Sequence, residues 1–129
     1  MIQNDRRRYP RYEAKVGATI STTGHKIQAD LVDISEGGFG VISEKAIEPG
    51  TKVSVSLELK GNFTIQGTVI WSSYICDDDK NHYRMGIETE RIILKDIKAI
   101  GFPEKSELVA QIIFQIKKQG IKVVEKYSP

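Results

Sequence analysis

Short runs of alternating apolar and polar residues fill the middle of the chain. The clearest covers residues 51–59, where valine or leucine stands at every odd position from 53 and a polar residue at every even one. The same period of two recurs over residues 63–71, and it is the period of a β-strand buried on one face. We therefore predict that residues 13–90 form short strands separated by turns. Phe63 and Trp71 follow the apolar phase, so we expect both in the core, with the rim of a binding site as the lesser alternative for Trp71.

The register of the first two predicted strands can be read from the sequence. Apolar residues alternate along both segments and, with a turn at Thr23 and Gly24, they face one another in pairs: Val16 with Leu31, Ala18 with Ala29, and Ile20 with Ile27. A slip of two residues would leave the same residues on the same face. Because an antiparallel hairpin returns the chain to its origin, residues 33–36 must lie beside residues 11–14.

Beyond Glu90 the spacing of apolar residues becomes that of a helix. They recur three or four positions apart: Leu108, Val109, Ile112, Ile113 and Ile116. This spacing, with Gly120 as the C-cap, predicts an amphipathic helix over residues 104–119 that packs on the strands. Residues 91–101 fit a helix or a strand equally well, and the tail after Gly120 fits a short strand or frayed chain. The predicted fold class is mainly β, a small antiparallel barrel with a C-terminal amphipathic α-helix.

Length and composition narrow the class of protein. The chain has 129 residues, which fits one domain, and no repeat or low-complexity segment divides it. Its apolar runs are far shorter than the ~20 residues that span a bilayer, so we expect no membrane insertion. A single cysteine, Cys76, excludes an internal disulfide and fits a cytoplasmic location.

The distribution of arginine points to a shaped anion as the ligand. The net charge is only +2, yet four of the six arginines fall within six residues near the start: Arg6, Arg7, Arg8 and Arg11. A guanidinium group presents a planar fork of donors that matches phosphate oxygens and the guanine edge, and it stacks on flat rings. We expect residues 1–12 to form a flexible arginine-rich arm before a barrel domain of residues 13–129.

Two short motifs carry a resemblance to a known family. Arg7 and Arg11 match an Arg-x-x-x-Arg motif, and 21 residues after Arg11 the residues Asp33, Ser35 and Gly38 match Asp-x-Ser-x-x-Gly. In this order and at this separation the motifs resemble those of the PilZ domain family of cyclic di-GMP receptors. The resemblance continues through the later strands, and it implies a six-stranded antiparallel β-barrel of the split-barrel type.

The resemblance also implies a binding site for cyclic di-GMP, which carries two phosphodiesters and two guanines. Arg7 and Arg11 can fork onto a phosphate or onto guanine O6 and N7, and can stack on the base. Asp33 can accept from guanine N–H donors or hold an arginine in place, and the Ser35 hydroxyl suits a phosphate oxygen. Because the hairpin delivers Arg11 beside Asp33 and Ser35, we expect the two motifs to form one site.

Four further residues complete the expected binding site. Gly37 and Gly38 expose backbone N–H groups and remove side chains where a ligand must approach closely. Arg8 lies between the motif arginines, although an extended arm would turn it toward solvent. Arg6 directly precedes the motif, and in PilZ-like proteins an arginine there is associated with a stacked ligand dimer. The number of ligand molecules stays open.

No catalytic or metal-binding pattern accompanies these motifs. His25 and His82 are isolated, and Asp77, Asp78 and Asp79 lack the alternating ligand spacing of a calcium loop. We therefore expect a protein that is not an enzyme and that uses no metal or cofactor besides its ligand.

Our leading hypothesis is a cytoplasmic receptor that binds cyclic di-GMP and, by ordering its arm, passes the signal to an effector protein. Two alternatives stay open: a PilZ-like adaptor that binds no nucleotide, and a barrel that uses its basic arm on single-stranded nucleic acid. The retained motif arginines count against the adaptor. Only Tyr9 and Tyr12 supply the aromatic residues among basic ones that nucleic-acid binding requires, so that alternative is the weakest.

Overall fold

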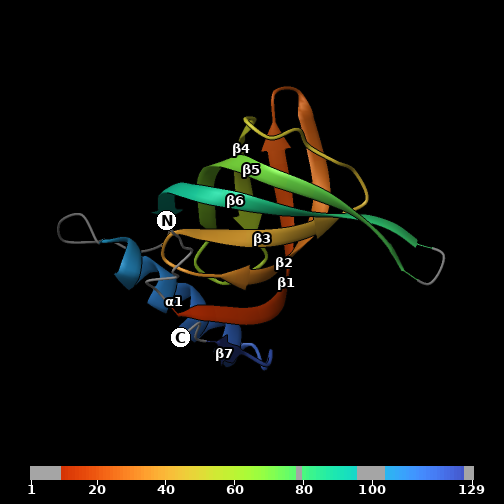
Figure 1. Cartoon of the computed structure of the whole chain (residues 1–129). Coiled ribbons are helices and arrows are strands. Elements are labelled where there is room, and N and C mark those ends of the chain that lie inside the picture. The colour runs from red at the N-terminus through yellow and green to blue at the C-terminus, as the bar shows by residue number, and fades with distance from the viewer. Residues whose placement is uncertain (1–9, 78–79, 96–103, 127–129) are drawn as a thin grey trace, which may run out of the picture.

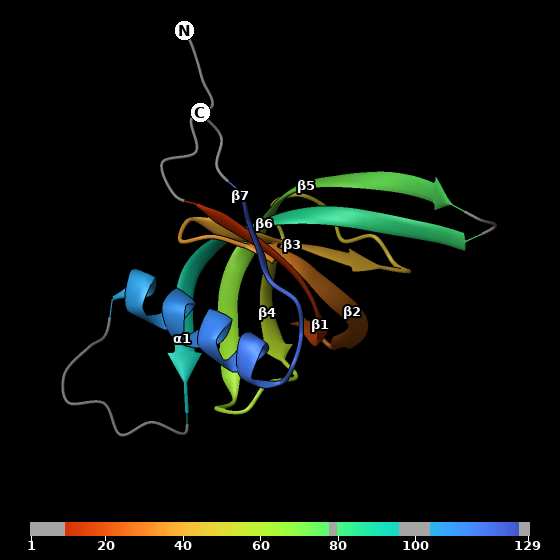
Figure 2. The same cartoon turned by 90° about the horizontal axis from the view of Figure 1, so that it is seen from below.

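Six antiparallel strands close into a ring, and a helix packs against it (Figures 1 and 2). The computed structural model describes residues 10–77, 80–95 and 104–126. Its elements are β1 (Arg11–Thr22), β2 (His25–Ile34), β3 (Gly38–Ser43), β4 (Lys52–Leu57), β5 (Phe63–Asp77), β6 (Lys80–Leu94), α1 (Lys105–Lys118) and β7 (Val124–Lys126). The ring runs β1, β2, β3, β6, β5, β4 and back to β1, while β7 pairs with the beginning of β1. The predicted six-stranded antiparallel barrel with a C-terminal helix is confirmed.

The first hairpin has the predicted register. Strands β1 and β2 turn at Thr23 and Gly24, and Gly24 takes a positive φ of 75°, which a residue without Cβ adopts without strain. The three predicted apolar pairs all occur: Val16 with Leu31, Ala18 with Ala29, and Ile20 with Ile27. Further along the hairpin, Glu13 lies opposite Asp33. The return of the Asp33 segment to the start of β1 is therefore also confirmed.

The alternating runs bury their apolar phase inside the ring. Val53 and Val55 of β4 and Phe63 and Ile65 of β5 are all buried, whereas the polar residues between them lie toward solvent. The prediction that Phe63 belongs to the core is confirmed.

The corresponding prediction for Trp71 is wrong. A β-bulge between Val69 and Trp71 adds one residue to β5, so that Val69 lies opposite Ile87 and Trp71 lies opposite Gly86. One extra residue reverses the alternation of faces beyond that point. Trp71 therefore points to the outside of the barrel, and 43% of its surface is exposed.

Helix α1 packs the predicted apolar stripe into the core of the barrel. Its buried residues are those expected: Leu108, Val109, Ile112, Ile113 and Ile116. At its first turn, Lys105 donates a hydrogen bond of 2.8 Å to the carbonyl oxygen of Thr89 on β6. At its end, Gly120 has a φ of 83° and donates its N–H to the carbonyl oxygen of Lys117. The helix thus covers the barrel as an amphipathic element with a glycine stop.

The segments that the sequence left open are now assigned in part. Strand β6 continues to Leu94, so residues 91–94 are strand, while residues 96–101 lie outside the described residues. The tail forms the short strand β7. Strand β1 begins at Arg11, so Arg11 and Tyr12, which the sequence predicts as the end of the arm, are part of the first barrel strand.

The packing of α1 predicts the effect of truncating its central residue. Ile112 is fully buried, and replacing such a residue by alanine removes apolar contacts and leaves a cavity. We expect I112A to lower the free energy of unfolding by about 3 kcal/mol in urea titrations. The neighbouring exposed position provides the control, since Q111A should change stability by less than about 0.5 kcal/mol. Equal effects of both substitutions would show that α1 does not pack on the barrel.

Candidate functional site

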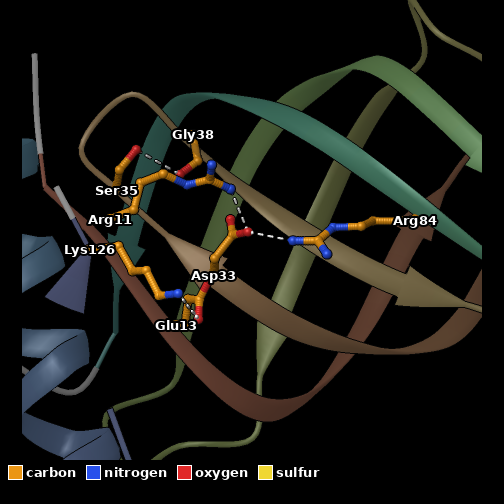
Figure 3. Close-up of polar contacts among 7 residues, drawn as sticks. All are labelled: Arg11, Glu13, Asp33, Ser35, Gly38, Arg84 and Lys126. Atoms are coloured by element: carbon orange, nitrogen blue, oxygen red, sulfur yellow. Dashed lines mark hydrogen bonds and ion pairs between the residues drawn. The ribbon is translucent and has the colours of Figure 1, made fainter. Parts of the chain in front are cut away.

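A buried carboxylate lies between two arginines on the outer face of the barrel (Figure 3). Asp33 accepts hydrogen bonds at Oδ2 from Arg11 at 2.6 Å and from Arg84 at 2.9 Å. The Asp33 side chain is 4% exposed, and the side chains of Arg11 and Arg84 are 26% and 38% exposed. Hydrogen bonds between ionised groups are short and strong. We refer to Arg11, Asp33 and Arg84 as the Arg–Asp–Arg cluster.

Three strands supply the cluster, and a glycine on a fourth gives it room. Met85 is fully buried, so its neighbour Arg84 faces outward from β6. Between β2 and β6 lies β3, where Gly40 is the register partner of Asp33. A Cβ atom on Gly40 would lie 3.0 Å from Oδ1 of Asp33. A side chain at position 40 would therefore crowd the carboxylate that meets Arg84.

A second glycine continues this row toward β5. Gly40 is paired with Gly86 of β6, and Gly86 is paired with Trp71 of β5. A Cβ atom on Gly86 would lie 2.1 Å from Nε1 of Trp71, so the indole ring lies directly over this glycine. Across four strands the outer face thus carries Asp33, two glycines and a half-exposed indole. The row joins a charged group to a flat aromatic surface with little side-chain bulk between them.

The turn between β2 and β3 closes on itself. The backbone N–H of Ser35 donates to the carbonyl oxygen of Gly38 at 2.8 Å, and the Ser35 hydroxyl donates to the same oxygen at 3.3 Å. A Cβ atom on Gly38 would lie 2.7 Å from the carbonyl oxygen of Ile87, so Gly38 permits the close approach of β3 and β6. A Cβ atom on Gly37 would meet no atom within 4 Å. The close packing of β3 on β6 therefore explains why residue 38 is a glycine, whereas Gly37 borders open space.

The structure brings together the predicted site residues that it describes. Arg11 lies against Asp33 at the end of β2, and the turn of Ser35, Gly37 and Gly38 leads directly from β2 into β3. The remaining predicted residues, Arg6, Arg7 and Arg8, lie outside the described residues.

Sequence reasoning missed Arg84 and misplaced Trp71. The alternation of Tyr83, Met85 and Ile87 already placed Arg84 and Gly86 on the opposite face of that strand, which was a usable signal. The sequence contains no such signal for Trp71, because the alternation of apolar and polar residues does not show where a strand contains a bulge.

Strand β7 holds the beginning of β1 next to the cluster. Arg11 is paired with Lys126, and Glu13 forms an ion pair of 3.7 Å with Lys126 (Figure 3). Burial raises the pKa of Tyr12, and the nearby carboxylate of Glu125 raises that pKa further. The protonated phenol can donate to this carboxylate, so Tyr12 adds a side-chain contact to the short β1–β7 pairing.

The chemistry of this face favours a ligand that is both anionic and flat. Two guanidinium groups share one carboxylate, so the cluster keeps an excess positive charge and N–H donors on its partly exposed arginines. The indole of Trp71 offers an exposed π-surface. Among the described residues, no group of His, Cys, Asp and Glu side chains is placed to hold a metal ion. In the same part of the chain, no helix has the length and apolarity needed to cross a membrane.

Fold and site together define a six-stranded antiparallel barrel with a charged and aromatic patch on its outer face. Residues 5–101 match the model of the PilZ domain, and the chain belongs to the PilZ domain family. The predicted family is confirmed. No curated protein matches the chain by sequence.

Solved structures that share the fold include a PilZ domain and two longer proteins. The PilZ domain of YcgR from Escherichia coli with c-di-GMP superposes with a TM-score of 0.65 at 18% identity, covering 90% of this chain and 95% of that one. Bacillus subtilis MotI/DgrA, an inhibitor of motility, gives a TM-score of 0.60 at 20% identity, covering 92% of this chain and 53% of that one. YcgR from Escherichia coli in complex with c-di-GMP gives a TM-score of 0.60 at 19% identity, covering 90% of this chain and 48% of that one. The chain thus spans about half the length of these two longer proteins.

The buried position of Asp33 predicts a large effect of neutralising it. In D33N the two guanidinium groups would remain side by side without a carboxylate between them. We expect the free energy of unfolding to fall by about 2–3 kcal/mol, less than for a fully buried ion pair because both arginines are partly exposed. The control E13Q removes the exposed carboxylate that pairs with Lys126 and should cost less than about 1 kcal/mol. If D33N unfolds at the same urea concentration as the wild type, the cluster does not stabilise the barrel.

The contact of Trp71 with Gly86 can be tested by fluorescence, because Trp71 is the only tryptophan. In G86A the new methyl group would occupy the position of the indole edge, so the ring must move away from β6. We expect the emission maximum and the quenching by iodide to change. The control G37A adds a methyl group in open space and should leave the emission unchanged. Identical spectra for G86A and the wild type would contradict the placement of the ring.

Proposed function

We propose that the protein is a receptor for cyclic di-GMP, which it binds on the outer face that carries the Arg–Asp–Arg cluster and Trp71. The observation that supports this most strongly is the convergence of Arg11, Asp33 and Arg84 from three strands on one surface, next to an exposed indole. Cyclic di-GMP offers two negatively charged phosphodiesters and two flat guanines. Membership of the PilZ family and the fold shared with the c-di-GMP-bound YcgR domain support the same ligand.

The two arginines of the cluster have complementary roles in this proposal. Asp33 fixes one side of each guanidinium group, which lowers the entropy that the arginines lose when a ligand binds. Their remaining N–H donors are then available for a phosphate or for guanine O6 and N7. Arg84 thereby joins the motif residues as a ligand contact.

Trp71 provides the stacking surface for a guanine. Its ring lies over Gly86, with Gly40 next along the row toward Asp33. A purine that stacks on the exposed indole can extend its polar edge across these two glycines toward the cluster. Stacking of a base on an aromatic side chain contributes about 1–3 kcal/mol.

The motif residues on either side of this face complete the proposed site. Arg6, Arg7 and Arg8 precede β1 in the chain, and their guanidinium groups would bind the phosphates. The Ser35 hydroxyl and the backbone N–H of Gly37 would bind from the turn itself. With Arg6 included, the site would hold a stacked pair of ligand molecules, so we expect two ligands per chain in calorimetry and one in the variant R6A.

Binding would be passed to another protein through a change of surface. A ligand held between residues 6–11 and the turn of residues 35–38 would join these segments into one continuous face. That face combines protein side chains with the ligand, and an effector protein that recognises it would bind only the ligand-loaded form. The protein itself would perform no chemistry on cyclic di-GMP.

Isothermal titration calorimetry with cyclic di-GMP tests the proposal. We expect R84A and R11A to weaken binding at least tenfold, because each loses charge-assisted hydrogen bonds worth about 1.5–3 kcal/mol. W71A should weaken it by a similar factor. The matched control is R91A, which removes an exposed arginine from the same strand β6 at a distance from the cluster.

The ligand controls are GTP and a short single-stranded oligonucleotide. GTP should not reproduce the binding heat, and the oligonucleotide should bind only weakly and with steep salt dependence. A wild-type protein that gives no heat with cyclic di-GMP, or R84A and R11A variants that bind as tightly as R91A, would refute the proposed site.

A further inference from the structure

The β5–β6 hairpin carries an apolar surface that the barrel leaves exposed. Beyond the ring the two strands continue as a ribbon that projects to one side in both views (Figures 1 and 2). On this part of β5, Ile70, Trp71 and Tyr74 are 54%, 43% and 54% exposed. Large apolar side chains that gather on one exposed element mark an interaction surface.

The outer edge of β5 is also without a strand partner along this ribbon. Strand β4 pairs with residues 64–68, and Val69 exchanges backbone hydrogen bonds with Gly50 and Thr51. From residue 70 to residue 76, the described part of the chain pairs β5 with β6 alone. An unpaired strand edge is a template on which another strand can add.

Apart from the β-bulge between Val69 and Trp71 at one end, this edge lacks the features that usually prevent such addition. Exposed edge strands are normally protected by charged residues or proline. Residues 67–76 read Gly-Thr-Val-Ile-Trp-Ser-Ser-Tyr-Ile-Cys and contain neither. The edge therefore has no charge with which to select a charged partner, and it fits an uncharged strand rich in β-branched and aromatic residues. The same residues of a second copy form such a strand.

We propose that two copies of the chain pair through this edge, antiparallel and about a twofold axis at Ser73. Ser73 is the midpoint of residues 70–76, so an axis there pairs every residue of the unpartnered run. It places Trp71 of one copy opposite Ile75 of the other, a favourable aromatic and β-branched pair. The product is a continuous four-stranded sheet, β6–β5–β5–β6, with closed twofold symmetry.

The ends of the two hairpins fit this arrangement. The partner strand can extend only as far as Val69, where Gly50 and Thr51 already occupy the edge. The twofold axis pairs Val69 of one copy with position 77 of the other, which is the last position of its β5. The length of the unpartnered run therefore matches the space available at both ends of the paired segment.

This pairing goes beyond cyclic di-GMP binding and does not depend on it. Edge pairing uses backbone N–H and C=O groups, so the indole of Trp71 stays on the outer face of the sheet. A failure of the ligand proposal would leave the self-association unchanged, and the reverse also holds.

Sedimentation and light scattering of the ligand-free protein test the proposal. We expect concentration-dependent association to twice the mass of one chain. In S73K two ammonium groups would face each other across the axis, which should weaken association about fivefold. S73E should weaken it likewise, whereas a mixture of S73K and S73E should restore the dimer. The control S56K introduces the same lysine at an exposed serine of β4, away from the ribbon, and should associate like the wild type.

The single native cysteine reports the register. Cys76 is exposed and lies three residues from Ser73, so the two Cys76 Cα atoms should be about 20 Å apart at 3.3–3.4 Å per residue. Pulsed dipolar spectroscopy on spin-labelled Cys76 should give one distance consistent with this spacing.

Thermal unfolding of S73K checks that the variant is folded, because Ser73 also pairs with Arg84 within the hairpin. A wild-type chain that stays monomeric at its highest soluble concentration, an unaffected dimer in S73K, or a different Cys76 distance would each overturn the proposal.

Discussion

The carboxylate of Asp33 is the group on which the outer face of this barrel depends. It lies nearly buried at the end of β2 and accepts hydrogen bonds from Arg11 on β1 and Arg84 on β6. Strands β1 and β2 form the first hairpin, whereas β6 is the last strand of the ring in the sequence, so the two ion pairs tie the beginning of the barrel to its end. A carboxylate in this position is favourable only while both guanidinium groups are present, because an unpaired buried charge is costly. The cluster therefore links the stability of the barrel to the chemistry of its surface.

Glycine at two positions makes this surface possible. Gly40 leaves room for Asp33, and Gly86 accepts the ring of Trp71 against the backbone. The two residues are direct register partners, and both are buried, one beneath the carboxylate of Asp33 and the other beneath the indole. A flat, anionic ligand matches this face, because the exposed indole offers a stacking surface and the two arginines offer guanidinium donors. The proposed cyclic di-GMP site follows from this combination of charge and flatness.

Much of the fold could be predicted because it depends on local period and on one turn. The alternation along β1 and β2, together with the turn at Gly24, was sufficient to give the correct pairs and to bring Asp33 to the start of β1. Helix α1 was likewise specified by its apolar spacing and by Gly120. Trp71 could not be placed, because the bulge after Val69 depends on pairing with β6 and leaves the local pattern unchanged. Arg84 was missed for a related reason, since its partner Asp33 is 51 residues away in the chain.

Nuclear magnetic resonance during a titration with cyclic di-GMP tests most directly whether this outer face binds the ligand. Trp71 contributes the only indole N–H signal of the protein, and the Nε–H signals of Arg11 and Arg84 report on the cluster. We expect these three signals to shift together and to saturate at one ligand ratio, while the amide signals of the buried face of α1 stay in place. Saturable shifts that leave the indole and both guanidinium groups unchanged would place the ligand elsewhere and contradict the account.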